Sequence, residues 1–322
     1  MASAKEIQNR IKSVSDTMKI TNAMYMMSSM KLRKAKSRLA ATEPYFNALE
    51  ESIADIFFHF PEIEHIFFDN RAKDKEEVVK KRCFVVITGD KGMAGAYNHN
   101  VIKETEKLLS ETPDAKLFVV GEVGRNYFKS RGYNVDEDFV YTAYNPSLHR
   151  ARIIEELIVK LYLDEELDEV KVICTRMVNS MREEVEVHRI LPLGVHDFLR
   201  NELQDKAREN AETGGLEKSD ELYNINPSPE GILEKLVRQY ITGYMYGVLV
   251  EGTAAEENAR MMAMQSATDN AVAMLSSLSI EFNRVRQAAI TQEITEVIGG
   301  AKALKKKKKK KTSSSNNEIS EQ

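Results

Sequence analysis

Two long helical segments, one at each end of the chain, limit what this sequence can fold into more than any other feature. Apolar and small residues recur at alternating spacings of four and three from Ile7 to Leu39, and again through most of Met261 to Ala289. A seven-residue repeat of this kind places one stripe along each helix and is typical of a coiled coil. About 220 residues separate the two segments. The simplest fold therefore pairs the two ends as an antiparallel coiled coil.

Proline and glycine mark where these helices begin and end. The first helix is expected from Ala4 to about Phe60, with a kink or joint at Pro44. The second is expected to begin after Ser228, which precedes a proline at the first helical position. No proline follows before Leu304, and Gly299-Gly300 should end or weaken the last turn.

The middle of the chain changes to short β-branched runs that alternate with helical spacing. Strands are expected at 83–88, 117–121, 170–175 and 184–191, and helices at 101–110, 123–130 and 148–163. Alternation of this kind indicates a Rossmann-like α/β domain with a largely parallel sheet.

The predicted fold class is therefore α/β plus a long antiparallel coiled coil, in which the terminal helices form a rod. Its parts are an N-terminal coiled-coil helix, a charged linker, the α/β domain, a polar loop, the C-terminal coiled-coil helix and a disordered lysine-rich tail. Their expected bounds are 1–60, 61–82, 83–200, 201–229, 230–304 and 305–322.

Charge and cysteine content exclude several classes of function. The net charge of −4 gives no attraction of the whole protein to nucleic acid, although residues 1–39 hold nine basic against two acidic side chains. Cys83 and Cys174 lie in apolar runs and are expected to be reduced core residues. The histidines show no metal-ligand spacing, and no apolar run is long enough to span a bilayer. No catalytic, cofactor or metal site is expected, and no direct membrane insertion.

Parts of both terminal helices are apolar around most of their circumference. In the first, this holds from Ile20 to Met30, and in the second from Ala288 to Ala301. A helix that is apolar all round is buried on all sides. Two interpretations stay open: a methionine-rich shaft enclosed by a collar of other subunits, or a thicker bundle core.

Four stretches carry a resemblance to a known family. The run KEIQNRIKSVSDTMKITNAMYMMSSMKLRKA (5–35) closely resembles the N-terminal signature of the γ subunits of F-type ATP synthases, and residues 259–304 resemble their C-terminal signature. TGDKGMAGAYN (88–98) is similar to the family's glycine-rich turn, and YNINPSPE (223–230) to the start of its last helix. The resemblance extends from residue 1 to about 304.

This resemblance implies a rotor without a catalytic site of its own. In the family, the terminal helices form an asymmetric shaft inside a ring of three α and three β subunits, and ATP is made in β. The α/β domain lies near the ε subunit and the membrane c-ring, at the cytoplasmic face of the cell membrane. Ion flow turns the shaft, which drives the β sites in sequence and regulates ATPase activity.

The resemblance also implies contact residues. The family's polar contacts to β map onto Arg286 and Gln287. Other implied bearing or β-contact positions are Met24, Lys31, Arg33, Lys34, Arg260, Thr291 and Glu293. The basic side chains among residues 31–38 would meet acidic loops of β, and otherwise form a solvated helix face.

The glycine-rich turn retains four residues of the family's pattern: Asp90, Gly92, Gly95 and Asn98. Neither GxxxxGK[ST] nor GxGxxG is present, so nucleotide binding is not expected. The glycines are expected to permit positive φ or close packing.

Three other classes are weighed against the rotor: a stand-alone coiled-coil assembly protein, an enzyme built on the α/β domain, and a nucleic-acid binder using both basic segments. The sequence does not decide whether the coupled ion is H⁺ or Na⁺, or whether the complex mainly makes ATP or hydrolyses it. The tail that contains Lys305–Lys311 lies outside the family's pattern and is interpreted as solvated, without a central function.

Overall fold

The computed structural model describes residues 3–60, 62–68, 81–179, 182–196, 198 and 228–317, with the side chains of the last helix described to residue 302. The chain divides into two compact units. The first consists of residues 1–24 and 264–322, and the second of residues 25–263. Both terminal helices contribute a segment to each unit.

The terminal helices begin close to where the sequence predicts. Helix α1 spans Ala4–His59 and helix α7 spans Pro229–Asn317. Ser228 caps α7 as expected, because its Oγ accepts a hydrogen bond from the backbone N–H of Gly231 at 3.2 Å. The expected joint at Pro44 does not interrupt α1. Packing beside it supports the helix, since the Phe46 ring stacks on Tyr240 with ring centroids 4.9 Å apart.

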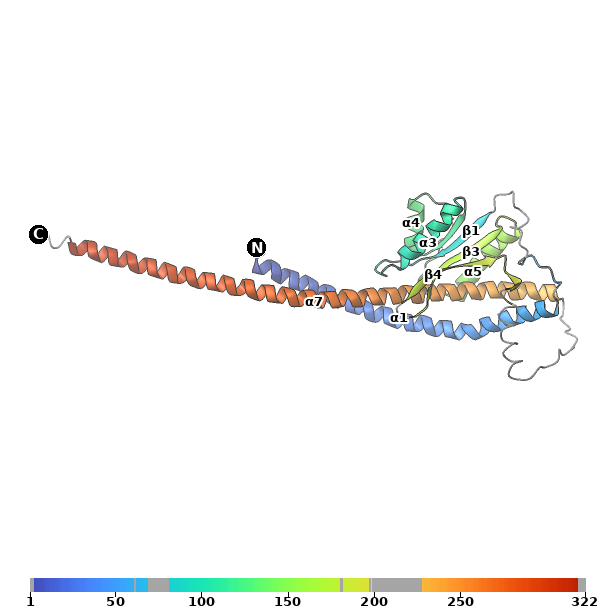
Figure 1. Cartoon of the computed structure of the whole chain (residues 1–322), viewed down its shortest axis with the longest axis horizontal. Coiled ribbons are helices and arrows are strands. Elements are labelled where there is room, and N and C mark those ends of the chain that lie inside the picture. Colours follow the sequence, from blue (N-terminus) through green and yellow to red (C-terminus); the bar gives the residue numbers. More distant parts are fainter. Residues whose placement is uncertain are drawn as a thin grey trace. The chain divides into compact units, whose positions relative to one another are not determined.

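In the first unit the predicted seam is present over most of its length. The hydroxyls of Thr21 and Thr268 share a hydrogen bond of 2.8 Å across the two helices. Buried seam residues of this unit are Ile7, Thr21, Met264, Ala271 and Leu278. Ala289 is exposed, contrary to its predicted place in the seam. The reason is that α7 continues past the start of α1 in this unit (Figure 1).

In the second unit the two helices run antiparallel, as predicted. Lys31 Nζ lies 2.9 Å from Glu257 Oε1, and Tyr45 donates a hydrogen bond to Gln239 Oε1 at 3.0 Å. Numbers rise along α1 while they fall along α7, which fixes the direction. The buried contact residues here are Leu32, Ala35, Val250 and Ala254.

The sheet of the second unit has four strands in the order β2-β1-β3-β4. Their bounds are β1 Arg82–Ile87, β2 Lys116–Val120, β3 Glu169–Met177 and β4 Glu183–Leu191. Strand β1 pairs in parallel with β2 and β3, and β4 pairs antiparallel with β3, so the predicted largely parallel sheet is mixed. Its helices are α3 Tyr97–Glu111, α4 Glu122–Ser130 and α5 Leu148–Leu163.

Alternate residues of each strand face opposite layers of helices. Phe84 and Val86 of β1 pack with α3 and α4. Val85 and Ile87 pack on the other side, with α5 and with segments of α1 and α7. Figure 1 shows the same order, with α3 and α4 on the far side of the sheet from α7. The α/β domain is thus joined to the rod through a shared apolar core.

The predicted linker 61–82 contains part of this core. Phe67 is fully buried, and its carbonyl accepts a hydrogen bond from the backbone N–H of Leu193 at 2.8 Å. This buried segment was not predicted, because the sequence that follows it is highly charged and is typical of a linker. Residues 69–80 lie outside the described residues, as do 201–227 of the predicted polar loop.

The predicted end of the last helix at Leu304 differs from the structure. Helical backbone continues through Gly299 and Gly300 to Asn317, where a disordered tail was expected from Lys305. A helical glycine costs about 1 kcal/mol relative to alanine, which weakens a helix without breaking it, and lysine is a good helix former. Residues 318–322 of the expected tail lie outside the described residues.

Candidate functional site

The last described segment of α7 presents the clearest exposed surface. Residues 286–302 are all exposed. Helical spacing puts Arg286, Ile290, Glu293 and Val297 in that order along one face of the helix. The apolar members are exposed to 47% at Ile290 and 72% at Val297. Exposed apolar side chains that lie in a row are typical of surfaces that bind another protein.

The neighbouring face of the same segment carries the other predicted contact residues. Gln287 and Thr291 are one turn apart, and the Thr291 hydroxyl donates a hydrogen bond to the Gln287 carbonyl at 2.9 Å. Ile294 and Ile298 continue this face and are about half exposed, at 54% and 50%. The prediction that this part of the last helix has apolar residues around most of its circumference is therefore confirmed. The structure brings all four predicted polar residues of this segment to the surface.

The N-terminal bearing residues are placed less uniformly. Met24 is half-buried, in the first unit. In the second unit the predicted basic residues Arg33 and Lys34 are exposed. Three methionines near them are more than half exposed: Met26, Met27 and Met30. This part of α1 combines an exposed methionine surface with positive charge, which suits a partner that carries acidic side chains.

Lys31 and Arg260 meet at one buried carboxylate. Glu257 Oε1 lies 2.9 Å from Lys31 Nζ and 3.0 Å from Arg260 Nη1. Arg260 also forms an ion pair with Glu256 and donates to the Gly92 carbonyl at 3.5 Å. Its side chain is 10% exposed, and its contact with β stays a prediction. The head group of Arg260 is held by contacts inside the second unit.

The glycine-rich turn is a structural joint. Both carboxylate oxygens of Asp90 accept hydrogen bonds from backbone N–H groups, those of Glu122 at 3.3 Å, Ala143 at 3.0 Å and Tyr144 at 2.9 Å. Asn98 Oδ1 accepts a hydrogen bond from the N–H of Gly89 at 2.8 Å. Asp90 thereby fastens the turn to the start of α4 and to the loop before α5.

Only one of the two singled-out glycines behaves as expected. Gly95 has a φ of +55°, which glycine adopts most easily, whereas a Cβ on Gly92 would meet no described atom within 4 Å. The sequence reasoning missed Gly89. A Cβ there would lie 2.8 Å from the carboxylate of Glu256, so the turn packs directly on α7 at this point. Its position beside Asp90 was the available signal.

A polar network on α7 was also missed. Glu256, Glu257 and Asn258 are all buried, and Asn258 donates a hydrogen bond to Glu183 of β4 at 2.8 Å. Burial raises the pKa of Glu256, against the opposing effect of Arg260, and burial also raises the pKa of Glu183. No prediction was made for this run from the sequence. In the structure it connects α7 with α1, β4 and the glycine-rich turn.

The described residues were compared with the arrangements that metal ions and reactive thiols need. Among them, no group of three or more His, Cys, Asp or Glu side chains is arranged to hold a metal ion. Cys83 and Cys174 are buried, and burial raises the pKa of the Cys174 thiol to about 12, so little thiolate forms near neutral pH. No helix within the described ranges is both long and apolar enough to cross a membrane.

Comparison with solved structures supports the fold. The central stalk of the mitochondrial ATP synthase of Tetrahymena thermophila, solved with its c-ring, matches with a TM-score of 0.52 and 22% identity, over 77% of this chain and 99% of that one. A chain of the Euglena gracilis mitochondrial ATP synthase matches with a TM-score of 0.52 and 16% identity, over 88% of this chain and 95% of that one.

Comparison of sequences shows the family. The model of the ATP synthase family matches residues 3–304. The ATP synthase gamma chain of Acetivibrio thermocellus is 44% identical over 95% of this chain and all of the relative. That of Ruminiclostridium cellulolyticum is 42% identical over 94% and 98%, and the sodium ion specific gamma chain of Acetobacterium woodii is 36% identical over 93% and 98%. The chain therefore belongs to the ATP synthase gamma-chain family.

Proposed function

We propose that this chain is the rotating central stalk of an F-type ATP synthase. It turns inside a ring of three α and three β subunits, and its asymmetry drives the β sites through different nucleotide affinities. The observation that carries this proposal is the segment 286–302 of α7, in which every residue is exposed and apolar and polar side chains alternate around the helix. The full-length similarity to gamma chains supports it.

The chain contributes mechanics and no catalytic residue. Exposed side chains such as Ile290 and Ile294 give a bearing surface without directional bonds, so that it slides against several neighbours in turn. Arg286 and Gln287 supply directional polar contacts through which torque passes to β. The exposed Arg33 and Lys34 make electrostatic contacts with acidic loops of β that are remade at each step.

The α/β domain connects the shaft to the ε subunit and the membrane c-ring. The complex lies as a peripheral assembly at the cytoplasmic face of the cell membrane, and the c-ring selects H⁺ or Na⁺. The core that α5 shares with the second-unit segments of α1 and α7 supports this role, since force on the α/β domain reaches these segments through direct packing.

The first test is native mass spectrometry of complexes captured from the protein's own cells through a tag at the C-terminus. The expected particle is ATPase-active and holds one copy of this chain with three α and three β subunits. A homo-oligomer, or a complex without nucleotide-binding subunits, would instead support the stand-alone coiled-coil interpretation.

The torque contacts are tested by the double substitution Arg286→Ala with Gln287→Leu. Assembly should persist, while ATP hydrolysis falls by about tenfold or more, because a hydrogen bond to a charged group is worth about 1.5–3 kcal/mol. Arg284→Ala, an exposed basic residue two positions away, is the matched control and should keep its rate. Normal turnover in the double variant would remove these residues from the mechanism.

A further inference from the structure

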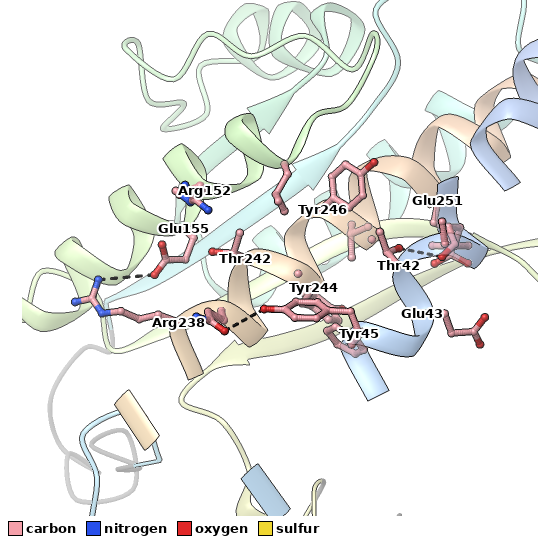
Figure 2. A pocket seen from close by; sticks show the side chains of 18 of the residues that line it. Thr42, Glu43, Tyr45, Arg152, Glu155, Arg238, Thr242, Tyr244, Tyr246 and Glu251 are labelled. Carbon is pink, nitrogen blue, oxygen red and sulfur yellow. Dashed lines mark hydrogen bonds and ion pairs between the residues drawn. The ribbon is translucent and has the colours of Figure 1, made fainter. Parts of the chain in front are cut away.

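A cavity of about 970 Å³ lies in the second unit between α1, α5 and α7. This volume is in the range of small-molecule sites. Figure 2 shows its aromatic and charged lining, with Glu155 and Glu251 toward opposite ends of the view. The Phe46 ring contributes to the wall from α1, and Tyr244 and Tyr246 contribute from α7. The acidic lining residues are Glu43, Glu155, Glu156 and Glu251, and the basic ones are Arg152, Lys235 and Arg238.

Among the described lining residues, Glu155 is the buried carboxylate of this cavity. Its side chain is 4% exposed, and its Oε1 has no hydrogen-bond donor among the described residues. The guanidinium of Arg238 is 3.9 Å away, beyond hydrogen-bond distance, and also pairs with Glu234 at 3.4 Å. Burial raises the pKa of Glu155 to about 7. A buried carboxylate in this state accepts a hydrogen bond from a cationic donor with little competition from water.

Gly247 gives an independent sign that the space is kept open. Glycine in a helix costs about 1 kcal/mol relative to alanine, and α7 carries Gly243, Gly247 and Gly252 within three turns. Close packing explains two of them, because a Cβ on Gly243 would lie 3.3 Å from Phe46, and a Cβ on Gly252 would lie 3.0 Å from Ile87. A Cβ on Gly247 would meet no described atom within 4 Å, and Gly247 lines the cavity.

We propose that this cavity binds a small aromatic amine, whose ammonium group donates a hydrogen bond to Glu155 and whose ring packs against Phe46 and Tyr244. The ammonium supplies the donor that Glu155 Oε1 lacks. The aromatic walls favour a flat body and attract a cation through their ring faces. Because the ligand touches three helices at once, its binding stabilises the junction of the α/β domain with the rod.

The test uses tryptamine and its neutral analogue tryptophol with the full chain. The protein contains no tryptophan, so indole emission excited beyond the tyrosine band reports only the probe. Tryptamine should bind at one saturable site with a Kd below about 1 mM, and tryptophol should bind at least about tenfold more weakly. Absence of saturable tryptamine binding, or equal affinity for tryptophol, would overturn the proposal.

Two substitutions test the site by independent routes. Glu155→Gln should weaken tryptamine binding by about tenfold and leave tryptophol unchanged, because only the charge-assisted hydrogen bond is lost. Gly247→Leu should weaken binding of both probes by placing a side chain in the cavity, and leucine favours the helix. Glu156→Gln removes an exposed carboxylate of the same lining and should change affinity less than about twofold. Full tryptamine affinity in either of the first two variants would refute the assignment.

Discussion

Substitution of Gly89 by alanine tests how the glycine-rich turn is fixed to the shaft. The added Cβ would lie 2.8 Å from both Cδ and Oε1 of Glu256. Real Cβ atoms essentially never approach another heavy atom this closely, so one partner must move. The carboxylate of Glu256 is restrained, because it forms an ion pair with Arg260, and Arg260 is itself held by Glu257 at 3.0 Å. The strain therefore falls on the contact between the turn and α7.

Overpacking of a single methyl group in a fixed site costs about 1–3 kcal/mol. A middle value of about 2 kcal/mol corresponds to an opening equilibrium that is shifted about 30-fold. The turn directly follows the central strand β1, so the amides of Arg82–Ile87 report this opening.

Hydrogen exchange followed by mass spectrometry on the full chain measures the effect. Peptides from β1 should exchange about 30-fold faster in Gly89→Ala than in the unsubstituted protein. Gly92→Ala is the matched control in the same turn, because its Cβ meets no described atom within 4 Å and its φ is not positive. Equal exchange in the two variants would show that the turn does not bear on α7 through Glu256.

Two further experiments test the packing and the charge of the second unit. Gly121→Ala should destabilise the second unit far more than Gly132→Ala, and melting temperatures of the two variants check this. Both glycines have positive φ, but a Cβ on Gly121 would lie 2.2 Å from a backbone oxygen, whereas a Cβ on Gly132 would meet no described atom within 4 Å. Burial raises the pKa of Glu155 from an ordinary 4.5 to about 7, so the folded chain binds a proton that the unfolded chain releases between these values. Stability should therefore fall by about 3 kcal/mol as pH rises through this window, and Glu155→Gln should remove that fall in thermal melts between pH 5 and 8.

Local periodicity made the rod predictable. Each seam position from Ile7 to Leu39 is buried or half-buried, because a supercoiled contact repeats at the spacing that the sequence displays. The strands and helices of the α/β domain were predictable for the same reason, since their apolar runs and caps are local signals. The orientation of β4 was not, because nothing in its alternating pattern distinguishes a parallel from an antiparallel neighbour.

Burial of charged residues was beyond prediction from sequence. Arg260 and Glu155 sit on helices in contexts that read as solvated faces, yet both are buried by elements distant in the chain. Phe67 was hidden by a charged stretch beside it. The last helix extends beyond its predicted end because two adjacent glycines weaken a helix without supplying a residue that stops it. In each case the burial of a residue or the end of a helix depends on tertiary contacts or on helix propagation. Neither of these leaves a local pattern in the sequence.

The contact residues implied by the family fall into two groups that respond to different assays. Arg286 is exposed on α7, whereas Arg260 is bound to Glu256 and Glu257 inside the second unit. Replacing Arg260 with alanine leaves the buried carboxylate of Glu256 without its cation and leaves Glu257 paired with Lys31 alone, and loss of one partner of a buried pair costs about 3–5 kcal/mol. Arg260→Ala should therefore lower the melting temperature of the chain, whereas Arg286→Ala should leave it unchanged and lower only the ATP hydrolysis rate of the captured complex. If Arg260→Ala instead kept full stability and lost turnover, Arg260 would act at a partner surface, and its buried placement would not describe the working rotor.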